Sequence, residues 1–303
     1  MSKALLFPGQ ASQYVGMGKD LYDRYDSVKA IFDTANKGVD FDLIDLCFNG
    51  PLEKLTETDV TQPAVFTHSY AMFSLLKEKG ITPDVVAGHS LGEFTALVAA
   101  EVLSFEDALA IVAKRGQLMK NCNDTVKGTM AAVMKFDIEK VKEACAEVDG
   151  VVQVANHNSD AQIVISGEVS AVHRAMDKVK EKGARIVKEL QVGGAFHSPL
   201  MKPAEDELAK VINDTTFNDA ICDVYANVSA KPVRSGAEIK ENSIKQLTSS
   251  VLWFDTIKNM HNNGVSTFYE SGPGTVLTGI TKRLKLDGVE LLSFDKLEDL
   301  DNL

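Results

Sequence analysis

The stretch 85–93, with the sequence VVAGHSLGE, constrains the fold of this chain more than any other. A short apolar run breaks at a Gly-His-Ser-Leu-Gly turn and continues into the Ala-rich run 93–100, which predicts a strand, a sharp turn and a buried helix. Because Gly88 and Gly92 have no Cβ, strand and helix can approach closely while Ser90 takes the strained backbone of the turn. Two glycines in five residues recur by chance, but the flanking strand and helix favour a nucleophile elbow at Ser90.

Length and composition bound the class of protein. The chain has 303 residues, 45% hydrophobic and 25% charged, so it can bury one large core or two unequal ones. No apolar run approaches the ~20 residues that span a bilayer, and the N-terminal run ALLF is too short for a signal peptide. We therefore expect a cytoplasmic protein without membrane contact.

Charge and cysteine spacing exclude further classes. The formal net charge of −11 disfavours nucleic acid and anionic lipid as partners. The four cysteines are scattered without a C-x-x-C pair, at Cys47, Cys122, Cys145 and Cys222. This spacing indicates neither a disulfide framework nor a metal site. We expect no nucleic-acid role and no bound metal.

Strand and helix patterns alternate in the first part of the chain. The candidate strand is 3–7, and the candidate helices are 20–37, 63–79, 93–101 and 104–121. Such alternation is typical of α/β proteins. Together with the elbow it predicts an α/β-hydrolase-like large domain, formed by residues 1–125 and 195–303.

The pattern changes after Gly128. Strand, helix, strand, strand, helix and strand patterns follow in turn, at 130–135, 138–147, 151–155, 162–166, 169–182 and 184–190. The order βαββαβ is the signature of a ferredoxin-like unit. We expect residues 126–194 to form such a subdomain, inserted into the large domain.

Helix and strand patterns continue after residue 194. They predict a helix at 203–212, a strand at 223–227, one or two helices within 244–258, a strand at 267–270, a helix at 275–285 and a strand near 289–292. The acidic segment 298–301 is expected to fray in solvent.

A serine nucleophile needs a base and an oxyanion site. Among six histidines, His197 lies in the loop GGAFHSP, where the chain re-enters the large domain, and such loops present functional side chains. His89 is adjacent to Ser90 on the turn and should point away from it. The developing oxyanion needs two N–H donors, for which the backbone groups of Leu91 and Gln10 are the best-placed candidates.

Six short motifs, in order and at the right approximate spacing, resemble those of the malonyl-CoA:acyl carrier protein transacylases. They are FPGQ at 7–10, GHSLGE at 88–93, KRG at 114–116, AFH at 195–197, QL at 246–247 and GPG at 272–274. Each motif alone is weak, but all six together are specific and cover nearly the whole chain. The family also carries an inserted ferredoxin-like segment.

The resemblance implies a role for each matching residue. Ser90 would take malonyl from coenzyme A as an ester and give it to the phosphopantetheine thiol of acyl carrier protein. His197 would be the base and then the acid, oriented by the backbone carbonyl of Gln246 rather than by a carboxylate. The N–H groups of Gln10 and Leu91 would form the oxyanion hole. By this resemblance the reaction would belong to fatty acid biosynthesis and would need no cofactor besides its substrate.

The resemblance assigns the selectivity for malonyl to Arg115. A guanidinium can hold the free carboxylate of malonate through two parallel charge-assisted hydrogen bonds, and acetyl offers no such group. Without the family match, Lys114-Arg115 would read as a solvated helix end. Asn156 and Asn158, between two predicted insert strands, would contact coenzyme A or pantetheine.

Without the family resemblance, the residues are also compatible with two other functions. A serine hydrolase would use the same elbow, although its histidine usually lies near the C-terminus, after the acid. A non-catalytic acyl-carrier-binding module would not need Ser90, His197 and Arg115 together.

Because acyl carrier proteins are typically acidic and this chain is too, we expect a local basic face, formed either by Lys178, Lys182, Arg185 and Lys188 or by Lys282, Arg283 and Lys285. The sequence does not distinguish fatty-acid from polyketide synthesis.

Overall fold

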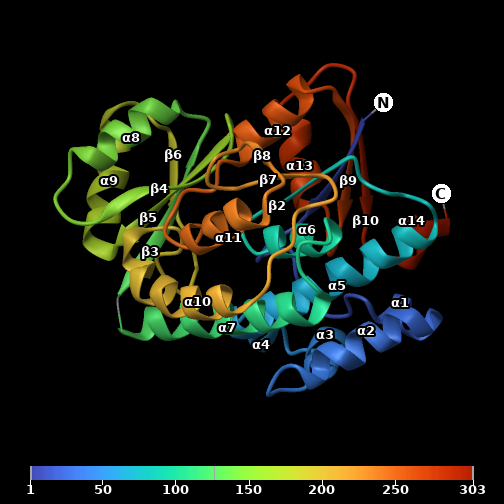
Figure 1. The fold of residues 1–303 in the computed structure, drawn as a ribbon. Coiled ribbons are helices and arrows are strands. Elements are labelled where there is room, and N and C mark those ends of the chain that lie inside the picture. The colour runs from blue at the N-terminus through green and yellow to red at the C-terminus, as the bar shows by residue number, and fades with distance from the viewer. Residues whose placement is uncertain (1, 126, 302–303) are drawn as a thin grey trace.

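The computed structural model describes residues 2–125 and 127–301 and contains two adjacent sheets (Figure 1). The strands are β1 (Ser2–Phe7), β2 (Val85–Gly88), β3 (Gly128–Met134), β4 (Val152–Ser159), β5 (Gln162–Glu168), β6 (Ile186–Glu189), β7 (Asp223–Tyr225), β8 (Pro232–Val233), β9 (Val265–Ser271) and β10 (Glu290–Phe294).

The larger sheet brings the ends of several strands to one edge. Its order is β10-β9-β1-β2-β7-β8, and all neighbouring pairs are parallel except β7 with β8. Parallel strands place their carboxyl ends at the same edge, where open α/β sheets bind ligands. The residues that follow β1, β2 and β7 therefore meet there, among them Gln10, Ser90 and Asn227.

Helices cover both faces of this sheet. They are α1 (Lys19–Arg24), α2 (Asp26–Lys37), α3 (Leu43–Asn49), α4 (Leu52–Leu55), α5 (Thr58–Glu78), α6 (Gly92–Ala99), α7 (Phe105–Thr125), the 3₁₀ turn η1 (Pro199–Met201), α10 (Lys202–Asp214), α11 (Gly236–Lys245), α12 (Trp253–Asn262), α13 (Val276–Arg283) and α14 (Leu297–Asp301). None of the helices in the described ranges is long and apolar enough to cross a membrane.

Alternate side chains along β1 pack into two different hydrophobic clusters. Leu5 and Phe7 pack in the cluster that includes residues of α5, α6 and α7, whereas Ala4 and Leu6 pack in the cluster with Trp253 of α12 and residues of α13. Successive side chains of a strand point to opposite faces, so this one strand belongs to both clusters. The buried sheet is the rigid base of the edge where Ser90 lies.

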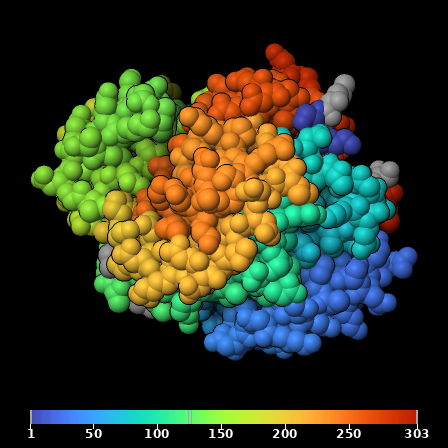
Figure 2. Space-filling model, in the orientation of Figure 1, coloured from blue at the N-terminus to red at the C-terminus, as the bar shows by residue number. Residues whose placement is uncertain are grey.

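The smaller sheet lies within residues 128–189, which we call the insert. Its strands are antiparallel in the order β4-β5-β3-β6, and α8 (Ile138–Ala146) and α9 (Val169–Glu181) pack on its outer face (Figure 1). In the space-filling view the insert is the green lobe beside the orange surface of α11 (Figure 2). Its edge strand β4 is joined to the rest of the protein by a parallel bridge between Asn156 and Val251.

Three element predictions differ from the structure in their bounds. Where one or two helices were expected within 244–258, the structure has the end of α11 and the beginning of α12, and residues 246–252 between them are not helical. Helix α5 begins at Thr58 rather than at 63, since its first turn is buried and packing outweighs the Pro63 signal. The expected helix 20–37 divides into α1 and α2.

The C-terminal segment also differs from expectation. Residues 298–301 lie in the short helix α14, whose Leu300 is buried. An apolar side chain removed from water stabilises this turn, which the acidic composition alone did not suggest. Val126, the predicted first residue of the inserted subdomain, lies outside the described residues.

Candidate active site

The elbow has the strained geometry that its sequence predicts. Ser90 has a left-handed φ of 52°. A Cβ built on Gly88 would lie 1.9 Å from the backbone of Gly92, and one on Gly92 would lie 2.0 Å from the Phe7 oxygen. Only glycine fits at both positions, because the backbone of β1, the turn and α6 is in direct contact. The strained Ser90 is thereby pushed out at the sheet edge.

Asn227 holds the elbow from the end of β7. Its side-chain oxygen accepts a hydrogen bond from the Ser90 N–H at 2.7 Å, and its amide nitrogen donates to the Gly88 oxygen at 2.7 Å. Two bonds from one buried amide fix both sides of the turn. Ser90 therefore has a set position before any ligand binds.

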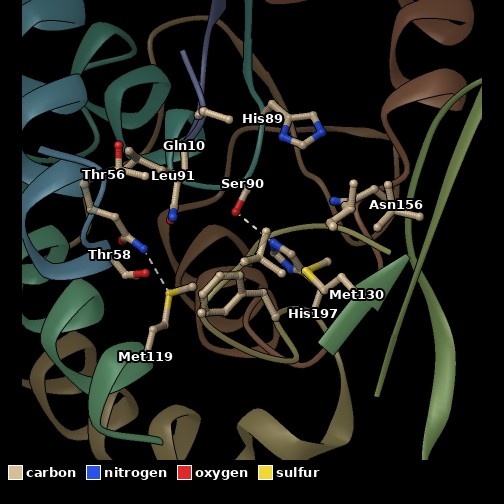
Figure 3. Close-up of a pocket in the computed structure, with 18 of the residues that line it drawn as sticks. Gln10, Thr56, Thr58, His89, Ser90, Leu91, Met119, Met130, Asn156 and His197 are labelled. Atoms are coloured by element: carbon tan, nitrogen blue, oxygen red, sulfur yellow. Dashed lines mark hydrogen bonds between the residues drawn. The ribbon is translucent and has the colours of Figure 1, made fainter. Parts of the chain in front are cut away.

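His197 meets Ser90 from the loop that follows the insert (Figure 3). The Ser90 hydroxyl lies 2.8 Å from His197 Nε2, and Nδ1 lies 3.0 Å from the Gln246 backbone oxygen and 3.1 Å from that of Ser249. Carbonyl oxygens only accept, so Nδ1 carries the proton and Nε2 is free to accept the serine proton. The loop after α11 therefore sets the tautomer that a general base requires.

The ring of His197 stays neutral over a wide pH range. Burial, reinforced by the positive charge of Arg115, lowers its pKa to about 3, while the Gln246 carbonyl acts in the opposite direction. No carboxylate hydrogen-bonds to this ring in the described ranges. The pair Ser90–His197 is therefore a dyad oriented by backbone carbonyls.

Arg115 is buried beside the nucleophile, only 1% exposed, and is not a solvated helix end. From α7, its Nη2 donates to Ser90 Oγ at 3.0 Å and to Gln246 Oε1 at 2.9 Å, while Nη1 donates to Gln62 Oε1 at 2.8 Å. Burial lowers its pKa to about 10, which still leaves it charged at neutral pH, and Glu93 opposes this shift. A fixed cation therefore lies within reach of any acyl group on Ser90.

Glu93 is a buried carboxyl group behind Arg115. It is 4% exposed, and its carboxylate accepts a 2.5 Å hydrogen bond from Gln246 Nε2, which also donates to the Ser90 oxygen at 2.8 Å. Burial raises the Glu93 pKa to about 7, although Gln246, Asn227 and Arg115 all favour its charged form. Gln246 thus contacts the base through its backbone and the Arg115–Glu93 pair through its side chain.

Gln10 and Leu91 lie next to each other on one wall of the cavity, beside Ser90 (Figure 3). The closeness of the β1 end to the elbow brings them together: a Cβ on Gly9 would lie 2.5 Å from the His89 oxygen. Within residues 2–125 and 127–301, neither backbone N–H donates to another protein group. Both groups follow strand ends at the same edge.

Asn156 and Asn158 lie on the insert side of the same cavity. Asn158 Oδ1 accepts from His89 Nε2 at 2.8 Å, and its Nδ2 donates to Gln162 Oε1 at 3.1 Å. Asn156 lines the cavity across from Ser90 (Figure 3). His89 points toward these residues rather than toward His197, and its ring packs edge-on against Trp253.

The cavity lies between the two sheets and has a volume of about 660 Å³. The large part of the chain contributes the polar groups around Ser90, and the insert contributes Met130, Asn156 and Val164. Volumes of this order suit a ligand of cofactor-fragment size with polar groups at one end. Within the described ranges, no group of three or more His, Cys, Asp or Glu side chains is placed to hold a metal ion.

Comparison with known proteins decides the family. Residues 4–288 match the model of the acyl transferase domain. The malonyl CoA-acyl carrier protein transacylase of Bacillus subtilis is 46% identical over 288 residues, covering 94% of this chain and 91% of the relative. The chain belongs to the acyl transferase family and, within it, to the malonyl CoA-acyl carrier protein transacylases.

Solved structures of transacylases share this fold. An acyl carrier protein S-malonyltransferase from Vibrio cholerae has a TM-score of 0.95 at 40% identity, covering 100% of this chain and 99% of its own. A malonyl-transacylase solved in complex with its type II polyketide synthase acyl-carrier protein has a TM-score of 0.94 at 37% identity, covering 100% and 98%. The chain therefore has the mixed α/β fold of the transacylases.

Three residues of this transacylase site were not predicted from the sequence. Gln62 and Asn227 contact the site only because α5 begins and β7 ends beside it, and single amides carry no sequence signal. Glu93 did have a sequence signal, because it is the only charged residue in the apolar run 92–100. A lone carboxylate on a fully buried helix indicates a buried partner, here Gln246.

Proposed function

We propose that this protein transfers the malonyl group from malonyl-CoA to the phosphopantetheine thiol of acyl carrier protein, in fatty acid biosynthesis, through a malonyl ester on Ser90. The observation that carries the proposal is the buried Arg115 Nη2, 3.0 Å from Ser90 Oγ, next to a serine–histidine pair. The family supports acyl transfer, and the cation selects an acyl group with a free carboxylate.

In the first half-reaction Ser90 attacks the thioester carbonyl while its proton moves to His197 Nε2. The tetrahedral oxyanion is stabilised by the N–H groups of Gln10 and Leu91. The C–S bond then breaks, the coenzyme A sulfur takes the proton from His197, and malonyl stays on Ser90. In the second half the pantetheine thiol gives its proton to His197 and attacks the ester carbonyl. The bond between that carbon and Ser90 Oγ then breaks, Ser90 Oγ takes the proton back from His197, and malonyl leaves as a thioester of the carrier protein. No cofactor or metal takes part.

Arg115 is the proposed source of selectivity. In the free protein its Nη2 donates to Ser90; a malonyl carboxylate would take that donor together with Nη1 as a bidentate pair. Acetyl leaves a buried cation without a new partner, which costs about 2–5 kcal/mol and corresponds to a preference of tens to thousands. Asn156 and Asn158 are proposed to contact the coenzyme A or pantetheine chain at the insert side.

Labelling with malonyl-CoA or acetyl-CoA, followed by mass spectrometry, tests the function. We expect a malonyl ester on Ser90, absent in Ser90→Ala and reduced at least tenfold in Arg115→Ala. Lys114→Ala is the matched control, since it removes the neighbouring charge that bonds Gln117 instead of the site. Equal labelling by acetyl-CoA would remove the role of Arg115, and release of malonate to water without transfer to carrier protein would indicate a hydrolase.

The carrier protein is proposed to dock at the C-terminal end of α13. On the insert, Lys178 pairs with Glu181, and Lys182 pairs with Glu143 and Glu147, so two of the four basic side chains of that group are neutralised. Within the ranges that the structure describes, Lys282, Arg283 and Lys285 form no ion pair. The same helix carries Leu277 and Ile280 of the cavity wall. A malonyl-transacylase bound to its carrier supports such a partner.

Charge reversal distinguishes the two basic groups. Changing Lys282, Arg283 and Lys285 to glutamate should slow transfer to carrier protein at least tenfold, while acylation by malonyl-CoA stays unchanged. Changing Lys178, Lys182, Arg185 and Lys188 to glutamate is the control and should have little effect. The reverse result would move the docking surface to the insert.

The finer architecture is also a proposal. We assign residues 1–125 and 195–303 to an α/β-hydrolase-like domain and 126–194 to a ferredoxin-like subdomain. The strand–elbow–helix unit at Ser90 supports the first assignment, and the βαββαβ order of the insert supports the second. A cytoplasmic location fits the proposed pathway.

A further inference from the structure

One side chain of the insert connects the two loops on which the catalytic base depends. Gln153 lies on the edge strand β4, and its Nε2 donates to the backbone oxygens of His197 at 2.8 Å and of Thr248 at 3.0 Å. The first loop carries the imidazole. The second carries the Gln246 and Ser249 carbonyls that bond Nδ1.

These contacts belong to a longer junction between β4 and residues 248–251. The Val251 N–H donates to the Ala155 oxygen at 2.8 Å, the His157 N–H donates to the Val251 oxygen at 3.0 Å, and Ser250 Oγ donates to the Val154 oxygen at 2.5 Å. The junction holds the insert against the rest of the protein. Of these contacts, only one hydrogen bond of Gln153 reaches the backbone of His197 itself.

We propose that Gln153 is a positioning residue for His197, so that the insert sets the geometry of the base as well as forming a cavity wall. His197 has a left-handed φ of 56°, a conformation that a non-glycine residue keeps only when its surroundings hold it. Gln153 holds its carbonyl, and the loop after α11 holds its ring. With one anchor removed, the imidazole can turn away from Ser90 Oγ, now 2.8 Å distant.

The inference rests on the proposed function, because it requires His197 to act as the base. Loss of the anchor should reduce the rate of the chemical step while leaving the binding of malonyl-CoA unchanged, since Gln153 lies outside the cavity lining. A purely structural role would instead lower stability and leave the folded fraction fully active.

Gln153→Met, which keeps the length of the side chain but has no donor, is compared with the wild type in single-turnover acylation by malonyl-CoA. We expect the saturating rate to fall about 10- to 100-fold with little change in half-saturating concentration. Gln153→Glu should be at least as slow, because an ionised carboxylate cannot donate and would face two carbonyl oxygens.

Ser250→Ala is the matched control. It removes one side-chain bond from the same junction and leaves both Gln153 bonds in place, so acylation should stay within about twofold of the wild type. Equal rates for Gln153→Met and Ser250→Ala at equal melting temperature would overturn the inference. If the wild type itself forms no malonyl ester on Ser90, the proposed function fails instead.

Discussion

The elbow at 88–92 and the base loop at 193–197 supply the two halves of one dyad, but they are held in different ways. At the elbow, neighbouring backbone allows nothing larger than glycine at Gly88 or Gly92. The base loop takes its geometry from hydrogen bonds to residues 44, 49 and 52 positions away in sequence, at Gln153, Gln246 and Ser249. Steric exclusion, together with the two Asn227 hydrogen bonds, fixes Ser90, whereas His197 depends on directed hydrogen bonds alone. The elbow should therefore fail by unfolding, and the base loop by losing activity in a folded protein.

Gly92→Ala should have the largest effect. The added methyl would meet the Phe7 oxygen at 2.0 Å, and neither backbone can move without separating β1 from α6. We expect the free energy of unfolding to fall by about 4 kcal/mol or more, or no folded protein to form. Urea denaturation followed by circular dichroism measures this change. If Gly92→Ala unfolded at the same urea concentration as the wild type, the elbow would not be fixed by contact with β1.

The environment of His197 in the base loop should be detected through the pH dependence of the acylation rate rather than through stability. A histidine of ordinary pKa 6.5 is ~3% neutral at pH 5, so the acylation rate would be roughly 30-fold lower there than on its plateau. Because burial and Arg115 lower the pKa of His197 to about 3, we expect nearly equal rates at pH 5 and pH 7. An acid limb centred near 6.5 in the acylation of Ser90 would contradict this.

Glu93, just after the elbow, should make stability depend on pH in a defined direction. Its pKa rises from 4.5 in the unfolded chain to about 7 in the buried site. Between these values only the folded protein holds the proton, so the free energy of unfolding falls as pH rises, by at most about 1.4 kcal/mol per pH unit. In Glu93→Gln this contribution is absent. Unfolding at pH 5, 6 and 7 should show the wild type losing stability relative to the variant, and a constant difference would contradict the shift.

Gly193→Ala, in the base loop, should have the smallest effect and is the counterpart of Gly92→Ala. A methyl there would lie 3.5 Å from Asn123 Nδ2 and 3.9 Å from Thr58 Oγ1, which are ordinary contacts, and its φ is not positive. We expect stability within about 0.5 kcal/mol and acylation within about twofold of the wild type. A loss comparable with that of Gly92→Ala would mean that steric exclusion fixes both regions.

The predictions that succeeded and those that failed differ in the range of the interactions involved. The strand before Ser90 and the helix after it could be predicted because apolar periodicity and two glycines lie within a few residues. One or two helices were expected within 244–258, but residues 246–252 are not helical and instead reach His197 and β4. Gln62 and Asn227 gave no signal, since each joins the site from an element placed there by packing.

The sequence by itself determined the reaction class, because an elbow is a local steric device whose parts are adjacent in the chain. With the family resemblance it also named His197, Arg115 and Gln246 as partners of Ser90. Only the tertiary structure decided how these residues are held: which nitrogen of His197 carries the proton, how Glu93 and two glutamines surround Arg115, and how Gln153 of the insert anchors the base. Those features depend on hydrogen bonds between distant segments, whose directions are set by the fold and are not encoded in any one stretch of sequence.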